Sequence, residues 1–426
     1  MPRLRSATQE TSTSIQVLLD VISPLFEFAE DEVPLLSTSR QLTYERNTLL
    51  LTETVYGLLP PMGKAQAEAL IDDVIGDLVK PAGIRAADML AELGRRLTPE
   101  GEREVRVIAF LNAPPDQSPD GMAVAETEFA KVSEAEMDGI LSNKPLMEKA
   151  AQHNPSAAKN LARFSAYVYA VRTPEYLAAQ GLEFVADRIT EPFERLRSLL
   201  NFAHHRRRIT MHFGVRREPM ARYAVSPFQF LKSGDKIEED FFWEVMPPDY
   251  RFHPIDPETR DAFARGAEHV YGPASGKLAQ HTGNLLLIYQ KALDTPDPEV
   301  AFFHFWQILE GIASPTKEGR GIESNRLVQR LKQLAPLEQT EEATLLKMVE
   351  RRNELVHRSV FPEEDAERQV RIIKLEADKF LLALLSILPQ LPDVIDLIEY
   401  YNVASDRSEA RLRALERALG LIKKPS

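Results

Sequence analysis

The residues of this chain best suited to chemistry lie near the end of a predicted helix at 339–358. Arg352, Asn353 and His357 occur there within six positions. Arginine is a permanently charged group that binds anions, and an imidazole changes its charge near neutral pH. These three residues therefore form the first candidate site.

The apolar spacing of the 339–358 helix predicts which of its faces is buried. The expected buried stripe consists of Leu345, Met348, Val349, Leu355 and Val356. Arg352 falls within that stripe, at i+7 from Leu345. Two interpretations stay open: the guanidinium extends past its apolar neighbours to water or pairs with a carboxylate, or it belongs to a functional site.

Helix geometry limits which of the three side chains can meet. His357 is five positions after Arg352, about 140° around an unbroken helix, whereas Asn353 and His357 are at i and i+4. Asn353 can therefore orient the imidazole. Arg352 joins the same site only if the helix ends nearby or a second copy of the chain supplies it.

A predicted helix at 298–313 offers a partner for Arg352. Its residues are largely apolar apart from His304, Gln307 and Glu310, which lie along one side and would be buried if this helix is central. Buried polar groups need partners. Glu310 is therefore the expected counter-ion of Arg352 or a residue that positions the site, and a purely structural Glu–Arg pair is the alternative.

The Arg352-Asn353-x-x-x-His357 motif on a late helix resembles the signature of the HEPN superfamily, Arg-x(4–6)-His with Asn often following the Arg. The aromatic run from Phe302 to Glu310 resembles the second helix of the ApeA-like branch of that superfamily. The resemblance covers about residues 259–400. It implies an all-α, antiparallel helical bundle.

This resemblance also implies a metal-independent endoribonuclease in which two protomers form one cleft. His357 would act as general acid or base while the ribose 2′-hydroxyl attacks the adjacent phosphate. Arg352 would stabilise the charge of the transition state, and Asn353 would fix the imidazole or a phosphate oxygen. Arg351 and Arg358 would add positive potential for the RNA backbone. No metal or cofactor is required.

The most basic part of the N-terminal half runs from His204 to Arg222, with six arginines and one acid, Glu218. Arg206, Arg207 and Arg208 are its centre and are expected either to contact RNA or to form a solvated helix end. The adjacent histidines His204 and His205 point apart on a helix, so we do not expect a metal site there.

The expected fold is an α+β N-terminal region followed by an all-α bundle. Strands are predicted at 105–111, 164–171 and 209–215, with a long helix at 182–205. We expect a mixed region at 1–245, a Pro-rich linker at 246–258 and the bundle at 259–426. The bundle helices are predicted at 259–293, 298–313, 322–334, 339–358, 363–388 and 405–421.

Composition and missing motifs exclude several classes of protein. The chain of 426 residues has no cysteine, so disulfides, thiolate metal sites and cysteine nucleophiles are absent. It contains no Walker lysine loop, dinucleotide-binding glycine motif, HExxH or GxSxG. Its formal net charge of −12 argues against a global attraction to nucleic acid. We expect a cytoplasmic protein with no membrane span.

An unidentified N-terminal region followed by a HEPN-like bundle resembles the architecture of toxin-type or anti-phage, abortive-infection effectors, and the resemblance implies that role. The predicted partners are an RNA substrate, with tRNA one candidate, a second copy bound through the bundle, and a phage or stress trigger sensed by the N-terminal region. Some toxins of the family are silenced by modification of a Tyr two places after the His; Ser359 stands there, which disfavours that partnership. The alternatives are an inactive HEPN scaffold for dimerisation or RNA binding, and an enzyme with an N-terminal site, which no motif supports.

Overall fold

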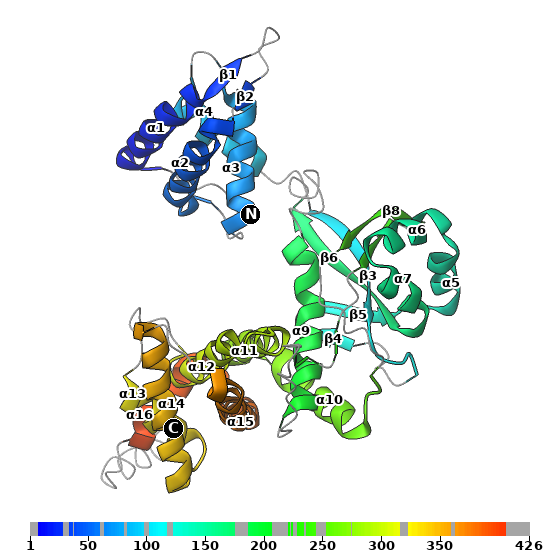
Figure 1. The fold of residues 1–426 in the computed structure, drawn as a ribbon, viewed down its shortest axis with the longest axis vertical. Helices are drawn as coiled ribbons and strands as arrows, with labels where there is room; N and C mark the ends of the chain where they lie inside the picture. The colour runs from blue at the N-terminus through cyan, green and yellow to red at the C-terminus, as the bar shows by residue number, and fades with distance from the viewer. Residues whose placement is uncertain are drawn as a thin grey trace, which may run out of the picture. The chain divides into compact units, whose positions relative to one another are not determined.

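The computed structural model forms two compact units, Met1–Val105 with Val171–Ile189 and Arg106–Ala170 with Thr190–Ser426 (Figure 1). Each unit is described by itself. The residues that the structure describes are 7–28, 34–36, 38–59, 64–80, 83–97, 102–116, 122–174, 186–206, 220–221, 223–224, 228–233, 236–243, 253–273, 275–315, 323–358 and 363–405.

The first unit is a small helical domain with a short hairpin. Its elements are α1 (Gln9–Ile22), a 3₁₀ turn at Ser23–Leu25, β1 (Phe26–Phe28), β2 (Pro34–Leu36), α2 (Thr38–Tyr56), α3 (Lys64–Leu78) and α4 (Ala86–Leu97). The strands β1 and β2 pair antiparallel. Apolar residues at helical spacing, among them Ile15, Leu19 and Ile22 of α1, form the core. Arg96 joins α4 to α3 through Asp73 and Asp77.

The second unit begins with a six-stranded sheet in the order β4-β5-β6-β3-β7-β8. The strands are β3 (Glu102–Leu111), β4 (Met122–Val124), β5 (Thr127–Lys131), β6 (Ser165–Pro174), β7 (Phe228–Ser233) and β8 (Lys236–Trp243). Pairing is antiparallel for β4–β5, β5–β6, β3–β7 and β7–β8. The predicted strands at 105–111 and 164–171 fall within β3 and β6. The predicted strand at 209–215 lies outside the described residues.

Successive side chains of each strand point to opposite faces of this sheet, and helices pack on both faces. One face carries α5 (Glu134–Ser142), α6 (Lys144–His153) and α7 (Pro155–Asn160), which end in a 3₁₀ turn at Leu161–Arg163. Their apolar residues pack on Phe110 and Phe230. The other face meets α9 (Ala186–His205), whose Phe193 ring contacts Tyr167 and Tyr169 of β6.

The C-terminal part of the second unit is helical. Its helices are α10 (Pro257–Tyr271), α11 (Lys277–Asp294), α12 (Pro298–Ala313), α13 (Ser324–Leu334), α14 (Gln339–Arg358), α15 (Glu363–Ile387) and α16 (Val394–Ser405). Helix α12 packs against α11 and α15. The predicted bounds of α12 and α14 are confirmed. None of the described helices combines the length and apolar composition that a membrane span requires.

Two features of the helical part differ from the prediction. The single helix expected at 259–293 is wrong, because α10 ends at Tyr271 and α11 starts at Lys277. The Gly272 amide closes α10 on the Glu268 carbonyl, a β-carbon at Gly272 would collide with that oxygen, and Pro273 follows. Helix α16 was not predicted, and the helix expected at 405–421 lies almost wholly outside the described residues.

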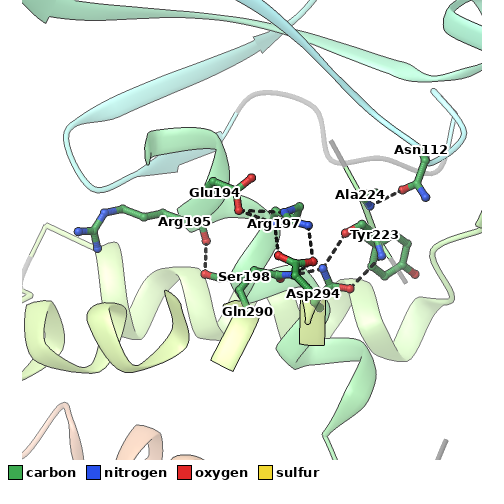
Figure 2. A network of polar contacts seen from close by, with 10 residues as sticks. Asn112, Glu194, Arg195, Arg197, Ser198, Tyr223, Ala224, Gln290 and Asp294 are labelled. Atoms are coloured by element: carbon green, nitrogen blue, oxygen red, sulfur yellow. Dashed lines mark hydrogen bonds and ion pairs between the residues drawn. The ribbon is translucent and has the colours of Figure 1, made fainter. Parts of the chain in front are cut away.

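Helix α9 is bonded to the helical part through a buried polar network (Figure 2). The Arg197 side chain is 3% exposed and donates to Asp294 at 2.9 and 2.5 Å and to Glu194 at 3.0 and 2.6 Å. Asn201 donates to the Tyr223 carbonyl and to Gln290, and accepts from the Tyr223 amide. The second unit therefore continues across the predicted linker at 246–258.

We expect Arg197→Ala to lower the free energy of unfolding by about 3–5 kcal/mol, because it leaves the Asp294 and Glu194 carboxylates without their cation. Arg265→Ala, at an exposed position of α10, is the control and should change stability by about 0.5 kcal/mol or less. Urea unfolding measures both. A loss below about 1 kcal/mol in Arg197→Ala would show that the network is dispensable.

Helix α15 contains a buried carboxyl group without a hydrogen bond at one oxygen. The Glu376 side chain belongs to a residue only 8% exposed, and its Oε2 atom has no partner. Burial raises the pKa of Glu376 to about 7, while nearby Lys379 lowers it and Glu341 raises it further. Glu376 is therefore protonated in the folded protein at a pH where the unfolded chain has already lost that proton.

This carboxyl group makes stability depend on pH. Between its ordinary pKa of 4.5 and the raised value of about 7, the folded state binds more protons, so stability falls as pH rises. Glu376→Gln should remove most of that fall and stabilise the protein at pH 8 by about 1–2 kcal/mol. Urea titrations at pH 5 and pH 8 test this, with the exposed Glu399→Gln as control. An unchanged difference between the two pH values in Glu376→Gln would refute it.

Candidate functional site

Helix α14 presents the apolar face that its sequence predicts. Leu345, Met348, Val349 and Leu355 are all buried. The side chain of Val356 lies outside the described residues. Helix α14 packs against α13 and α15, so this buried stripe fixes its rotation about its own axis.

Arg352 meets Glu310 at the edge of the helical part. The Arg352 Nη2 atom lies 3.4 Å from Glu310 Oε1, and both side chains are 30% exposed. The structure therefore brings together the two residues that sequence reasoning paired, at a partly solvated position and not deep in the core. The contact joins α14 to α12.

Asn353 contacts Arg352 and is exposed. Its Oδ1 atom accepts a hydrogen bond of 3.3 Å from Arg352 Nη1. His357 lies one helical turn further along the backbone of α14. The side chains of His357 and Arg358 are outside the described residues, so the expected Asn353–His357 contact and the expected role of Arg358 stay predictions.

Arg351 is occupied by contacts within the helical part. Its Nε atom donates to Gln369 of α15 at 2.9 Å, and Nη1 donates to Glu354 at 2.7 Å. Its side chain is only 17% exposed. The bond to Gln369 joins α14 to α15, and the bond to Glu354 lies within α14. An RNA phosphate would have to share the Arg351 guanidinium with these partners or displace them. Contact between Arg351 and RNA stays a prediction.

The polar stripe of α12 faces outward. Gln307 is exposed, and His304 and Glu310 are half-buried, with His304 Nδ1 3.2 Å from Gln307 Oε1. The opposite face, which includes Phe302 and Phe305, is fully buried. The three polar groups are therefore not buried at the centre of the helical part, because the aromatic side of α12 fills that place.

His281 of α11 is a residue near Glu310 that sequence reasoning missed. Its Nε2 atom donates to the Gly311 carbonyl at 3.0 Å, and burial lowers the pKa of the ring while that bond opposes the shift. A β-carbon at Gly311 would lie 2.6 Å from the Leu285 side chain. Gly311 therefore lets α11 and α12 approach closely, and a lone glycine in a bulky helix is the sequence signal for it.

The basic segment after α9 is described only in part. Arg206 is 21% exposed and lies 4.0 Å from Glu258, while Arg207 and Arg208 are outside the described residues. His204 and His205 are buried, and His204 Nδ1 lies 3.4 Å from the Thr259 hydroxyl. The histidine pair is thus enclosed, and RNA contact by the three arginines stays a prediction.

Within the described ranges, no group of three or more His, Cys, Asp or Glu side chains is arranged to hold a metal ion. No protein-family model, curated protein or solved structure matches this chain. What the candidate site can do is therefore judged from its own geometry: a half-exposed guanidinium, its carboxylate partner and an exposed amide can bind an anion from solvent.

The half-exposed Arg352–Glu310 pair should contribute little to stability. Exposed and partly exposed ion pairs are worth about 0–1 kcal/mol, so Arg352→Ala and Glu310→Gln should each lower the free energy of unfolding by about 1 kcal/mol or less. A double-mutant cycle with both single variants and the double variant measures their coupling. A coupling above about 2 kcal/mol would mean that the pair is a structural anchor.

Proposed function

We propose that the helical part is a HEPN-type, metal-independent endoribonuclease that works as a dimer. The observation that carries this proposal is the Arg352–Glu310 contact, with Asn353 beside it, where α12 and α14 meet the solvent. A guanidinium held loosely by one carboxylate keeps donors free for a phosphate. Because α14 stays helical through Arg358, His357 lies about 140° around the helix from Arg352, so a two-fold contact between two copies would bring a histidine to this phosphate.

In this proposal each residue has a defined task. Arg352 binds the scissile phosphate and stabilises the charge of the transition state, and Glu310 holds the guanidinium in place. In the dimer, one His357 takes the proton of the ribose 2′-hydroxyl as that oxygen attacks phosphorus, and the other His357, protonated, gives its proton to the departing 5′-oxygen. The products are a 2′,3′-cyclic phosphate and a 5′-hydroxyl end.

The biological role is part of the same proposal. Uncontrolled cleavage of RNA, with tRNA one candidate, would harm the host, so the N-terminal region would hold the nuclease in check until a phage or stress signal relieves it. The role is that of an abortive-infection or toxin-type effector in the cytoplasm.

A catalytically inactive scaffold is the second candidate. It is favoured by the engagement of Arg351 with Gln369 and Glu354, which uses one of the expected RNA contacts for packing. In that case the module would dimerise or bind RNA without cutting it.

The decisive experiment is incubation of the full chain with total tRNA and with a mixed-sequence RNA in EDTA. Wild type should cut, and Arg352→Ala, Asn353→Ala and His357→Ala should each lose activity, by about 100-fold or more for the histidine. The matched controls Arg326→Ala and Asn325→Ala remove the same side chains from exposed positions of α13 and should cut like wild type.

The chemistry of the ends and the fold of the variants complete this test. Fragments that carry 2′,3′-cyclic phosphate support attack by the 2′-hydroxyl, and 5′-phosphate ends contradict it. Thermal unfolding shows that each variant is folded. Cutting by His357→Ala at the wild-type rate would overturn the proposal, and RNA binding without cutting in every condition would favour the scaffold.

A further inference from the structure

The second unit contains a pocket of about 630 Å³, and the residues that line it are distant from Arg352 in the sequence. Three segments line it: the β4–β5 turn at Val124–Thr127, the first turns of α9, and the end of α10 with the start of α11. The volume lies within the range of about 300–1,000 Å³ that small-molecule sites occupy. The pocket therefore has the size to hold a small organic ligand.

Arg195 organises the polar side of this pocket. Its Nε and Nη2 atoms donate to Glu191 Oε1 at 3.0 and 2.6 Å, and Nη2 also donates to Asn284 Oδ1 at 3.2 Å. Figure 2 shows the Arg195 side chain extending away from the Arg197 network. Because the Asn284 oxygen is already bound, its NH₂ group is the part that stays available as a donor.

The amides of α11 have capacity left for a ligand. The Tyr271 hydroxyl, in contrast, is buried against the Arg195 guanidinium and supports that side chain. A β-carbon at Gly283 would lie 3.1 Å from that hydroxyl and 3.3 Å from Arg195 Nη1, so the glycine makes room for both. Gln280 and Asn284 are exposed on one face of α11, at i and i+4.

The β4–β5 turn is strained where it borders the pocket. Ala125 has a φ of 55°, and within the described residues it is the non-glycine residue with positive φ. This conformation costs roughly 1 kcal/mol or more for alanine. Positive φ is the ordinary geometry of a two-residue hairpin loop, and this turn places Glu126 at the rim of the pocket.

The charges of the lining disfavour an anionic ligand. Two carboxylates, Glu126 and Glu191, stand against one guanidinium, Arg195. A phosphate would therefore meet net negative charge. Apolar walls from Pro192, Val270 and other lining residues suit a flat ring, while the amides and hydroxyls can pair with donors and acceptors on its edge.

We propose that this pocket binds a neutral ribonucleoside. The amides of Gln280 and Asn284 pair with the edge of the base, and Glu126 accepts hydrogen bonds from the ribose hydroxyls. The ligand would contact the sheet, α9 and α11 together. Binding would stabilise the second unit by mass action. The site is independent of the proposed nuclease.

The test uses the full-length protein with adenosine, guanosine, cytidine and uridine, each at about 2 mM. Saturation-transfer NMR and thermal unfolding should detect binding of at least one nucleoside with a Kd below about 1 mM. Gln280→Ala and Asn284→Ala should each weaken that binding about fivefold or more, because each removes one hydrogen-bonding group at an exposed position. The 5′-monophosphate of the same nucleoside should bind more weakly than the nucleoside.

The control for loss of an amide is Asn325→Ala on α13, which should bind like wild type while all variants keep the wild-type unfolding temperature without ligand. The proposal fails if none of the four nucleosides binds the folded protein, or if Gln280→Ala and Asn284→Ala both bind as wild type does. It also fails if the monophosphate binds more tightly, or if glucose competes equally well.

Discussion

The buried guanidinium of Arg197 sets the constraint on which the second unit depends. Removing a cation from water costs several kcal/mol unless carboxylates and good hydrogen-bond geometry replace the water. Glu194 supplies one carboxylate from the same helix, and Asp294 supplies the other from the last residue of α11. The position of α9 on α11 is therefore fixed to within a hydrogen-bond length, and Asn201 and Gln290 extend the same junction.

Because α9 is fixed in this way, its other side can pack against the sheet. Phe193 packs on Tyr167 and Tyr169. Helix α11 then carries three separate features along its length: the amides that line the pocket, the His281 bond to Gly311 of α12, and the Asp294 end of the network. The position of Glu310 on α12 thus depends on the same helix that is held by Arg197.

The sequence predicts those parts of the fold that local patterns determine. The bounds of α12 and α14 follow from apolar residues at helical spacing, with Pro298 at the start of α12. The Glu310–Arg352 contact follows from a carboxylate on the largely apolar α12 and an arginine within the apolar stripe of α14. The break between α10 and α11 carried a signal, Gly272-Pro273, but the helical pattern on both sides outweighed it.

Other features depend on residues far apart in the chain, and no local pattern shows them. Arg195 and Arg197 lie two positions apart on one helix, yet Arg197 is enclosed and Arg195 lines a pocket. The difference comes from α11, where Asp294 binds Arg197 and Asn284 binds Arg195. The pocket itself combines three segments separated by more than fifty residues each. Such sites become visible only once the chain has folded.

Arg197 and Arg352 are both paired with carboxylates, but they differ in how far the guanidinium is exposed to solvent. Arg197 is 3% exposed and makes four hydrogen bonds to two carboxylates, so none of its surface is left for a ligand. Arg352 is 30% exposed and has one carboxylate at 3.4 Å. A pair of this second kind adds little to folding, because water competes with it. Its guanidinium therefore stays accessible to solvent, which is the property that the proposed phosphate site at the edge of α12 and α14 requires.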